Sequence, residues 1–214
     1  MPIPANLPDN PTEKPPRHRH VGTAGYPAWL VAIALAAIWW ALQWGGGPSA
    51  WGFDRAAIQH GQIWRLLSAH AVHLNLTHLA LNLLGLTAIL SVWSNELRGL
   101  RLPLLFLAGA TAASAGLWWG HPELAHYAGA SGALHGLFAA GLILATTTGR
   151  LFRLAAAGAL LLKLALEPHL GGGAAEMIGA PVIYAAHQWG ALGGGLGAAL
   201  WRLTARARSS APVD

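Results

Sequence analysis

Apolar side chains are gathered into six long runs, separated by shorter segments rich in polar residues, glycine or proline. A membrane-spanning helix needs about 20 mostly apolar residues, or about 17 at the short end. The runs cover residues 28–44, 77–93, 102–119, 130–148, 154–166 and 183–203. The fifth run is the shortest, and Lys163 interrupts it. The pattern predicts an all-α membrane protein, a bundle of six transmembrane helices.

Basic residues are unevenly distributed around these runs. They precede the first run, separate the second from the third and the fourth from the fifth, and close or follow the sixth. Arg55, Arg65 and Lys163 depart from this pattern. Loops rich in Lys and Arg remain in the cytoplasm, and six spans place both termini on that side. We therefore expect a disordered cytoplasmic leader at 1–27, a membrane domain at 28–203 and a cytoplasmic tail at 204–214.

The composition narrows the class of protein further. Charged residues make up 10% of the 214 residues and apolar residues 54%, whereas average soluble domains carry roughly 25% charged residues. The 13 Lys and Arg exceed the 8 Asp and Glu, but a membrane topology accounts for this excess without a nucleic-acid partner. The absence of cysteine excludes thiolate metal sites and cysteine nucleophiles.

Polar residues within the apolar runs mark a candidate site, because such residues are costly in a membrane. His78 and Asn82 are four residues apart and share one helix face. Ser131 lies at the start of the fourth run, and His187 lies in the sixth. Taken singly, a serine in a glycine-rich helix start is more often a packing residue. A lone intramembrane histidine is as often structural as functional.

Together these residues support acyl transfer. A serine hydroxyl becomes a nucleophile when an adjacent base takes its proton, and His187 can do this for Ser131 if their helices touch. The glycines that would allow such contact are Gly132, Gly136, Gly190 and Gly194. Candidate oxyanion donors are the backbone N–H of Ser131 and the side chains of His78 and Asn82. No carboxylate lies in these segments, so we expect a Ser–His dyad.

Four motifs follow one another along the chain: Trp64-Arg65, His78-x-x-x-Asn82, Gly129-x-Ser131-Gly132 and Ala186-His187-x-x-Gly190-x-x-x-Gly194. The ordered set resembles the rhomboid intramembrane serine proteases, over roughly residues 28–203 and in their compact six-helix form. The resemblance implies that Ser131 is the nucleophile and His187 the general base, with His78 and Asn82 beside the oxyanion. It gives Trp64 and Arg65 a structural role in the first loop. It implies neither a cofactor nor a metal.

The sequence departs from many rhomboids four residues after the nucleophile. His135 stands there in place of a tyrosine that stacks on the catalytic histidine. His135 could stack on His187 or serve as an alternative base, and we favour stacking. The Gly-x-Ser-Gly-x-Leu-His-Gly pattern, the pair Lys163-x-x-x-Glu167 and the small size are similar to the rhombosortase branch. Lys163 and Glu167 could simply neutralise each other, or they could contact the substrate.

The rhombosortase resemblance implies a substrate class and a location. That branch processes C-terminal tails made of a small-residue Gly-Gly motif, a membrane helix and a basic cluster, on proteins bound for the cell surface. We therefore expect a multi-pass protein of the bacterial inner membrane, with its site on the periplasmic side and transmembrane proteins as substrates. General rhomboid cleavage of other single-span proteins is the alternative.

Two other classes of protein stay open. A zinc site could use His70, His73 and His78, with or without His187. No His-Glu-x-x-His run is present, however, and zinc would leave the Ser131 motif unexplained. A non-catalytic membrane protein such as a transporter is the other alternative, but the internal repeats that transporters often contain are not evident. Otherwise His70 and His73 are expected to form hydrogen bonds that order the first loop.

Overall fold

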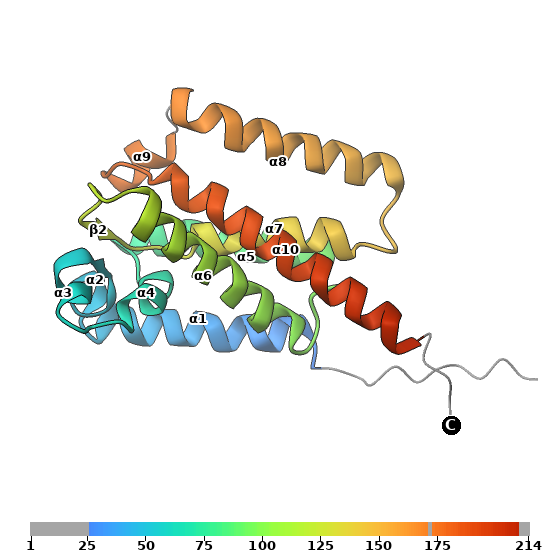
Figure 1. The fold of residues 1–214 in the computed structure, drawn as a ribbon, viewed down its shortest axis with the longest axis horizontal. Helices are drawn as coiled ribbons and strands as arrows, with labels where there is room; N and C mark the ends of the chain where they lie inside the picture. Colours follow the sequence, from blue (N-terminus) through green and yellow to red (C-terminus); the bar gives the residue numbers. More distant parts are fainter. Residues whose placement is uncertain (1–25, 171–172, 210–214) are drawn as a thin grey trace, which may run out of the picture.

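The computed structural model describes residues 26–170 and 173–209, and most of these residues are helical. The long helices of this part are α1 (Ala28–Trp44), α5 (Leu76–Trp93), α6 (Arg101–Gly120), α7 (Ser131–Leu144), α8 (Arg150–Leu170) and α10 (Tyr184–Ser209). They run back and forth along the length of the molecule, with α1 and α8 at opposite sides of the bundle (Figure 1). Every predicted apolar run therefore corresponds to a helix.

Three helices differ from the predicted runs by more than one residue at one or both ends. α7 already ends at Leu144, where Arg153 and Arg202 donate hydrogen bonds to the carbonyl oxygens of Ala145 (3.0 Å) and Ile143 (2.8 Å). α8 is longer than predicted at both ends. α10 continues past residue 203, so the first part of the predicted tail is helical. The predicted disordered leader lies almost wholly outside the described residues, as does the end of the tail.

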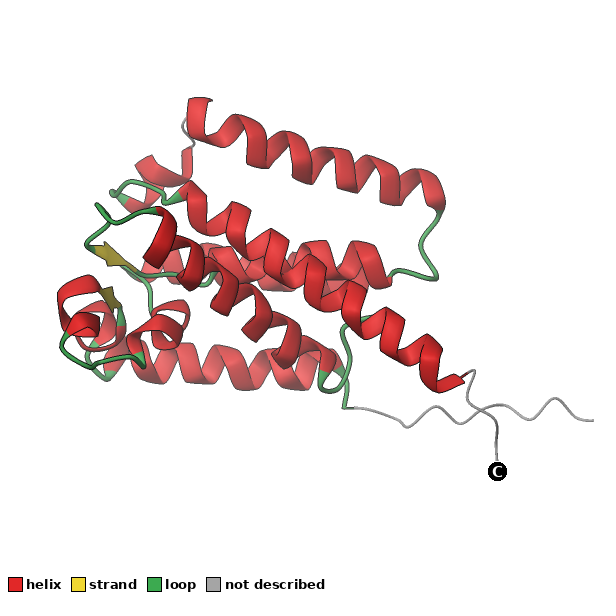
Figure 2. Ribbon diagram, viewed as in Figure 1, coloured by secondary structure: helices red, strands yellow, loops and turns green. Residues whose placement is uncertain are grey.

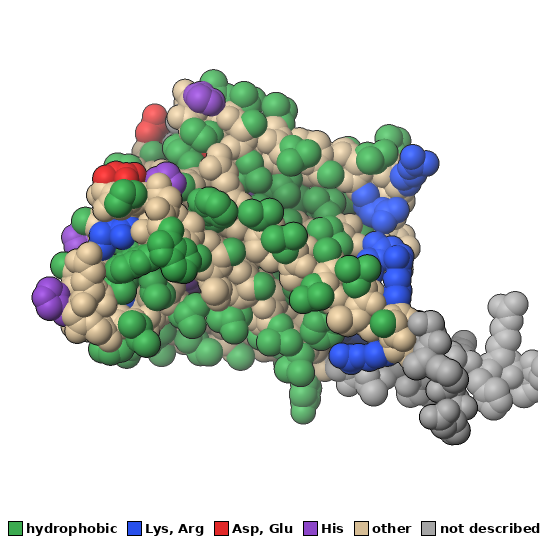
Figure 3. Space-filling model, viewed as in Figure 1, with side chains coloured by type: hydrophobic (Ala, Val, Ile, Leu, Met, Phe, Trp, Pro, Cys, Tyr) green, Lys and Arg blue, Asp and Glu red, His purple; other side chains and the backbone are tan. Residues whose placement is uncertain are grey.

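The surface of the bundle is strongly apolar. Large apolar side chains that are 63–68% exposed include Ile33 on α1, Leu84 on α5, Leu161 on α8 and Leu196 on α10. Figure 3 shows apolar side chains spread over the face in view, and soluble monomers rarely expose apolar surface of this extent. By length and composition, α5 and α6 could cross a membrane, whereas α1 and α7 are apolar but shorter. The count of six spans stays a prediction.

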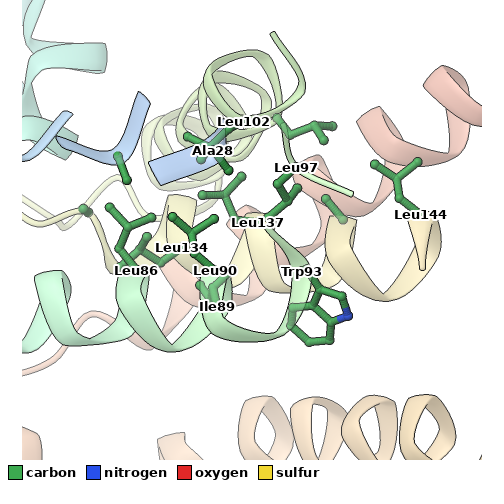
Figure 4. Packing of buried hydrophobic residues seen from close by; sticks show 14 of the residues in the cluster. Ala28, Leu86, Ile89, Leu90, Trp93, Leu97, Leu102, Leu134, Leu137 and Leu144 are labelled. Atoms are coloured by element: carbon green, nitrogen blue, oxygen red, sulfur yellow. The ribbon is translucent and has the colours of Figure 1, made fainter. Parts of the chain in front are cut away.

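α7 lies at the centre of the bundle, where it packs against α5, α6 and α10. Leu86 and Leu90 of α5 meet Leu134 and Leu137 of α7 in the buried cluster drawn in Figure 4. At the far end of the same contact, the ring of Trp93 packs edge-on against Phe138, with 4.6 Å between ring centroids. The helix that begins with Ser131 is therefore held from several sides.

The predicted glycine contact between α7 and α10 is confirmed. A Cβ atom at Gly190 would lie 2.0 Å from the carbonyl oxygen of Gly132, and one at Gly194 would lie 2.2 Å from that of Gly136. Any larger residue at these positions would force the two backbones apart. The contact brings the first turn of α7 beside the first turn of α10.

The segment between α1 and α5 contains α2 (Gly47–Trp51), β1 (Phe53–Asp54), α3 (Arg55–Gln59), α4 (Arg65–Ser68) and the 3₁₀ turn η1 (Ala69–Ala71). β1 pairs antiparallel with β2 (His126–Tyr127), which leads into α7 (Figure 2). This ladder corrects the all-α prediction, because strands of two residues leave no periodic signal in a sequence. A further short helix, α9 (Gly173–Ile178), precedes α10.

Two basic residues that depart from the predicted charge distribution bind backbone carbonyl groups instead. Arg55 donates three hydrogen bonds of 2.8–3.1 Å to carbonyl oxygens at the end of α6, where a positive charge is favoured. Arg65 is buried and donates to the carbonyl oxygens of Gly52 (2.9 Å) and Ser49 (3.1 Å). These contacts order the loop, whereas the neighbouring Trp64 is half exposed.

Most of the basic side chains that the structure describes gather at one end of the molecule (Figure 3). α6 and α8 begin at that end and α10 finishes there (Figure 1). Arginines of these helix ends are Arg101, Arg150, Arg153, Arg202, Arg206 and Arg208. α7 and α10 begin at the opposite end, so Ser131 and His187 lie far from the basic end.

Candidate active site

Ser131 is the first residue of α7, and the backbone just before it is shaped by a glycine. Gly129 has a φ of +135°, and a Cβ atom there would lie 2.6 Å from Cε1 of His78. The carbonyl oxygen of Gly129 accepts a hydrogen bond from the hydroxyl of Tyr127 (2.7 Å). Only glycine can combine this backbone conformation with contact against the imidazole ring, so Gly129 lets the chain pass directly beside His78 two residues before Ser131.

His187 contacts Ser131 directly. The distance between Nε2 of His187 and Oγ of Ser131 is 2.9 Å, which is hydrogen-bonding distance. His187 lies in the first turn of α10 and is 6% exposed. A serine beside an imidazole in a buried position is the geometry of an activated nucleophile.

The structure corrects the expectation that no carboxylate reaches His187. Glu167 of α8 accepts a hydrogen bond from Nδ1 of His187 through Oε1, at 2.9 Å. Its second carboxylate oxygen is paired with the ammonium group of Lys163. The sequence predicts a dyad because the three segments that contain His78, Ser131 and His187 hold no carboxylate. Glu167 lies in a fourth segment, where pairing with Lys163 at i, i+4 already explains its charge.

His135 lies one turn into α7 and stacks on His187. Their ring centroids are 4.2 Å apart and the ring planes differ by 16°. Nδ1 of His135 donates a hydrogen bond to the carbonyl oxygen of Ser131 (2.7 Å). This is the stacked arrangement that the sequence analysis favoured, and no hydrogen bond between His135 and the Ser131 hydroxyl is present among the described residues.

His78 and Asn82 occupy the first turns of α5, on the other side of Ser131. Asn75 caps this helix by accepting a hydrogen bond from the backbone N–H of His78 (2.9 Å). Nδ1 of His78 accepts a long hydrogen bond from the backbone of Leu74 (3.4 Å), which leaves the proton of the neutral ring on Nε2. Asn82 donates to the carbonyl oxygen of His78 (2.9 Å). Both side chains border the cavity that Ser131 also borders, and both carry N–H groups.

A cavity of about 1190 Å³ is bordered by Ser131, His187, His78 and Asn82. The rest of its wall is mainly apolar and comes largely from α5, α7 and α8. Pockets that bind ligands share this composition, with many apolar side chains and a few polar groups that converge. The polar groups of this site therefore face a space that suits an apolar chain segment.

The histidines do not form the predicted alternative zinc site. His70 is hydrogen-bonded to Ser114 (2.9 Å), and the rings of His73 and His78 meet edge to face with centroids 5.2 Å apart. In the described part of the chain, the group with donor atoms close together is His135, Glu167 and His187. The two rings of that group are nearly parallel, so their in-plane lone pairs do not converge on one ion.

The expectation that His70 forms a hydrogen bond that orders the first loop is confirmed, whereas the ring nitrogens of His73 have no hydrogen-bond partner in the described part of the chain. His70 is fully buried in the first loop, and its partner Ser114 lies on α6 and also donates to the carbonyl oxygen of Leu66. Burial lowers the pKa of His70 from its ordinary 6.5 to about 4, because a charged imidazole loses its hydration there. The neutral ring ties the loop to α6.

Acidification is expected to destabilise the protein through His70. Its pKa is lowered in the folded state, so the unfolded chain binds the extra proton first, and stability that is complete above pH 6.5 falls as the pH drops toward 4. Between pH 7 and pH 5 the loss from this residue is about 2 kcal/mol. Melting curves at both pH values test this, with His70→Gln as the comparison. An equal pH dependence in the two proteins would contradict it.

A comparison with known protein families supports the resemblance that the four sequence motifs indicate. The family model described as Rhomboid domain matches residues 60–203, which is more than half of the chain and includes all the site residues named above. A comparison with curated proteins gave no match.

Proposed function

Since the chain belongs to the rhomboid family, whose members are intramembrane serine proteases acting on membrane proteins, we propose that Ser131 is its nucleophile and His187 its general base. The observation that carries this proposal is the 2.9 Å contact between Oγ of Ser131 and Nε2 of His187 at the wall of an apolar cavity. A structural serine would not require an imidazole in that position.

In the proposed reaction, Ser131 attacks the carbonyl carbon of the scissile peptide bond while Nε2 of His187 takes its proton. The oxyanion forms near the Nε2–H of His78, the side-chain amide of Asn82 and the backbone N–H of Ser131, since a helix N-terminus favours negative charge. His187 then passes the proton to the leaving amine. Water resolves the acyl-enzyme, with His187 again acting as the base.

The substrate segment is proposed to lie in the cavity between α5 and α8. Residues of α5 such as Gly85 and Val92 and residues of α8 such as Ala156 and Leu160 form its apolar walls, which suit a membrane helix that unwinds near Ser131. The basic end of the bundle lies opposite the site. Under the positive-inside rule this supports six spans with cytoplasmic termini, and hence a site on the periplasmic side of a bacterial inner membrane.

Within the family, we propose the rhombosortase activity, which is removal of C-terminal Gly-Gly tails from proteins bound for the cell surface. The Gly129–Gly136 pattern and the Lys163 and Glu167 pair support this branch. A small-residue motif before a membrane helix unwinds easily, because glycine stabilises helices poorly. General cleavage of other single-span proteins is the alternative.

The test uses the full chain in liposomes with a fluorophosphonate probe, which labels an activated serine. Wild type is expected to be labelled and Ser131→Ala is not. An unlabelled wild type that melts cooperatively would contradict the serine mechanism. The branch is tested with a single-span substrate carrying a Gly-Gly tail and a matched tail with Leu-Leu in its place. Equal cleavage of both would replace the rhombosortase proposal with the general one.

His135 is expected to act as a stacking partner and not as a base. The stacked ring holds the imidazole of His187 in place, so His135→Tyr should keep most of kcat, whereas His135→Ala should lose about tenfold, as expected for a loosened catalytic group. Turnover of the substrate in liposomes measures both. An inactive His135→Tyr together with an active His187→Ala would reverse the assignment.

A further inference from the structure

Glu167 forms more contacts than a simple neutralising pair requires. One carboxylate oxygen accepts from His187 and the other is paired with Lys163. The side chains of Glu167 and His187 are only 9% and 7% exposed, whereas that of Lys163 is 50% exposed. Neutralisation at a membrane border explains the Lys163 contact alone. It does not explain why the carboxylate points inward to the imidazole.

We propose that Glu167 is a positioning residue that completes a Ser131–His187–Glu167 arrangement. This inference rests on the proposed serine protease function. When Nδ1 of His187 donates to Glu167, the neutral ring carries its proton on Nδ1 and presents the lone pair of Nε2 to the serine. Once Nε2 has taken the serine proton, the carboxylate stabilises the resulting imidazolium. Lys163 supplies the countercharge that an otherwise isolated buried carboxylate would lack.

The contact between Glu167 and His187 depends on where α8 lies relative to α10. None of the described residues of α8 is buried, so few contacts fix the helix in place. Next to the Glu167 contact, the side chain of Gln188 on α10 donates to the carbonyl oxygen of Leu164 on α8 (3.1 Å). His187 is therefore oriented for proton transfer only while α8 lies against α10 at this point.

The experiment compares wild type, Glu167→Gln, Glu167→Asp, Gln188→Ala and Ser131→Ala as full chains in liposomes. Glu167→Gln is expected to lower kcat by about 10²- to 10⁴-fold, because an amide can donate to Nδ1 and move the ring proton to Nε2. Its KM should stay unchanged. Glu167→Asp should recover part of kcat. Gln188→Ala removes the neighbouring helix contact but leaves the Glu167 contact with His187 in place, so it should lose far less kcat than Glu167→Gln.

Fluorophosphonate labelling separates the possible roles of Glu167, since the small probe has no substrate tail. The proposal requires a slower labelling rate in Glu167→Gln and a much smaller loss of rate in Gln188→Ala. A wild-type labelling rate with a raised KM would assign Glu167 to substrate contact and overturn the proposal. An equal loss of rate in Glu167→Gln and Gln188→Ala would assign it to helix docking, with the same consequence.

Melting curves in the same liposomes show whether each variant folds. If Glu167→Gln does not fold, Glu167→Asp decides alone: a slower labelling rate at unchanged KM supports the proposal, and wild-type values overturn it. Ser131→Ala keeps the two proposals apart. If wild type itself is as unreactive as Ser131→Ala, the proposed function fails, whereas a reactive wild type with a fully active Glu167→Gln removes only the role of Glu167.

Discussion

Replacing His187 with alanine is expected to lower kcat by about 10⁴- to 10⁶-fold, as loss of the base does in other serine proteases. The imidazole lies within hydrogen-bonding distance of the Ser131 hydroxyl, at 2.9 Å. Without it the hydroxyl keeps its proton and is a weak nucleophile. The variant should still fold, because the glycine contact between α7 and α10 does not involve this side chain.

The measurement is cleavage of a membrane-anchored substrate in liposomes, followed over long incubations so that weak residual activity is counted. His60→Ala is a matched control, because His60 is exposed and bonds only to its own helix turn at Ala56. It should retain full activity. A His187→Ala variant within tenfold of wild type would show that another group accepts the serine proton.

Alanine at Gly190 is expected to remove activity by separating the nucleophile from the base. The new Cβ atom would lie 2.0 Å from the carbonyl oxygen of Gly132, and a backbone atom cannot rotate away from it. Overpacking of this kind typically costs about 1–3 kcal/mol. A displacement of about 1 Å between reacting groups costs about 100-fold in rate, so activity should fall further than stability.

Gly158→Ala is the matched control for this substitution. Gly158 lies within α8, and no atom lies within 4 Å of the position that its Cβ would take. In a helix interior, alanine is favoured over glycine by about 0.5–1 kcal/mol, so this variant should melt at the same temperature or slightly higher and keep its activity. Equal melting temperatures and activities for Gly190→Ala and Gly158→Ala would mean that the close contact is dispensable.

The helices and part of the site can be predicted because both leave local patterns in the sequence. Apolar runs of membrane length are hard to mistake, and each coincides with a long helix. Glycines at four-residue spacing are informative because they allow two membrane helices to pack closely. The chain has such a pair in each of the two helices, Gly132 and Gly136 in one and Gly190 and Gly194 in the other. That contact allowed Ser131 and His187 to be joined across 56 residues of chain.

The remainder could not be predicted because it depends on how distant segments meet. Arg55 binds carbonyl groups 62–69 residues further along the chain, and backbone acceptors have no sequence signature. Glu167 carries a weak signal, since a carboxylate at the end of an apolar run is costly. Its pairing with Lys163 offered a sufficient explanation. Only the orientation of α8 against α10 reveals that the carboxylate also reaches His187.

The distribution of the site over the chain has a consequence for biosynthesis. Ser131 begins α7, Glu167 is near the end of α8 and His187 is near the start of α10, so the groups that would activate the serine are translated after it. Under the proposed mechanism, a chain emerging from the ribosome therefore carries an unactivated hydroxyl until α10 has been inserted.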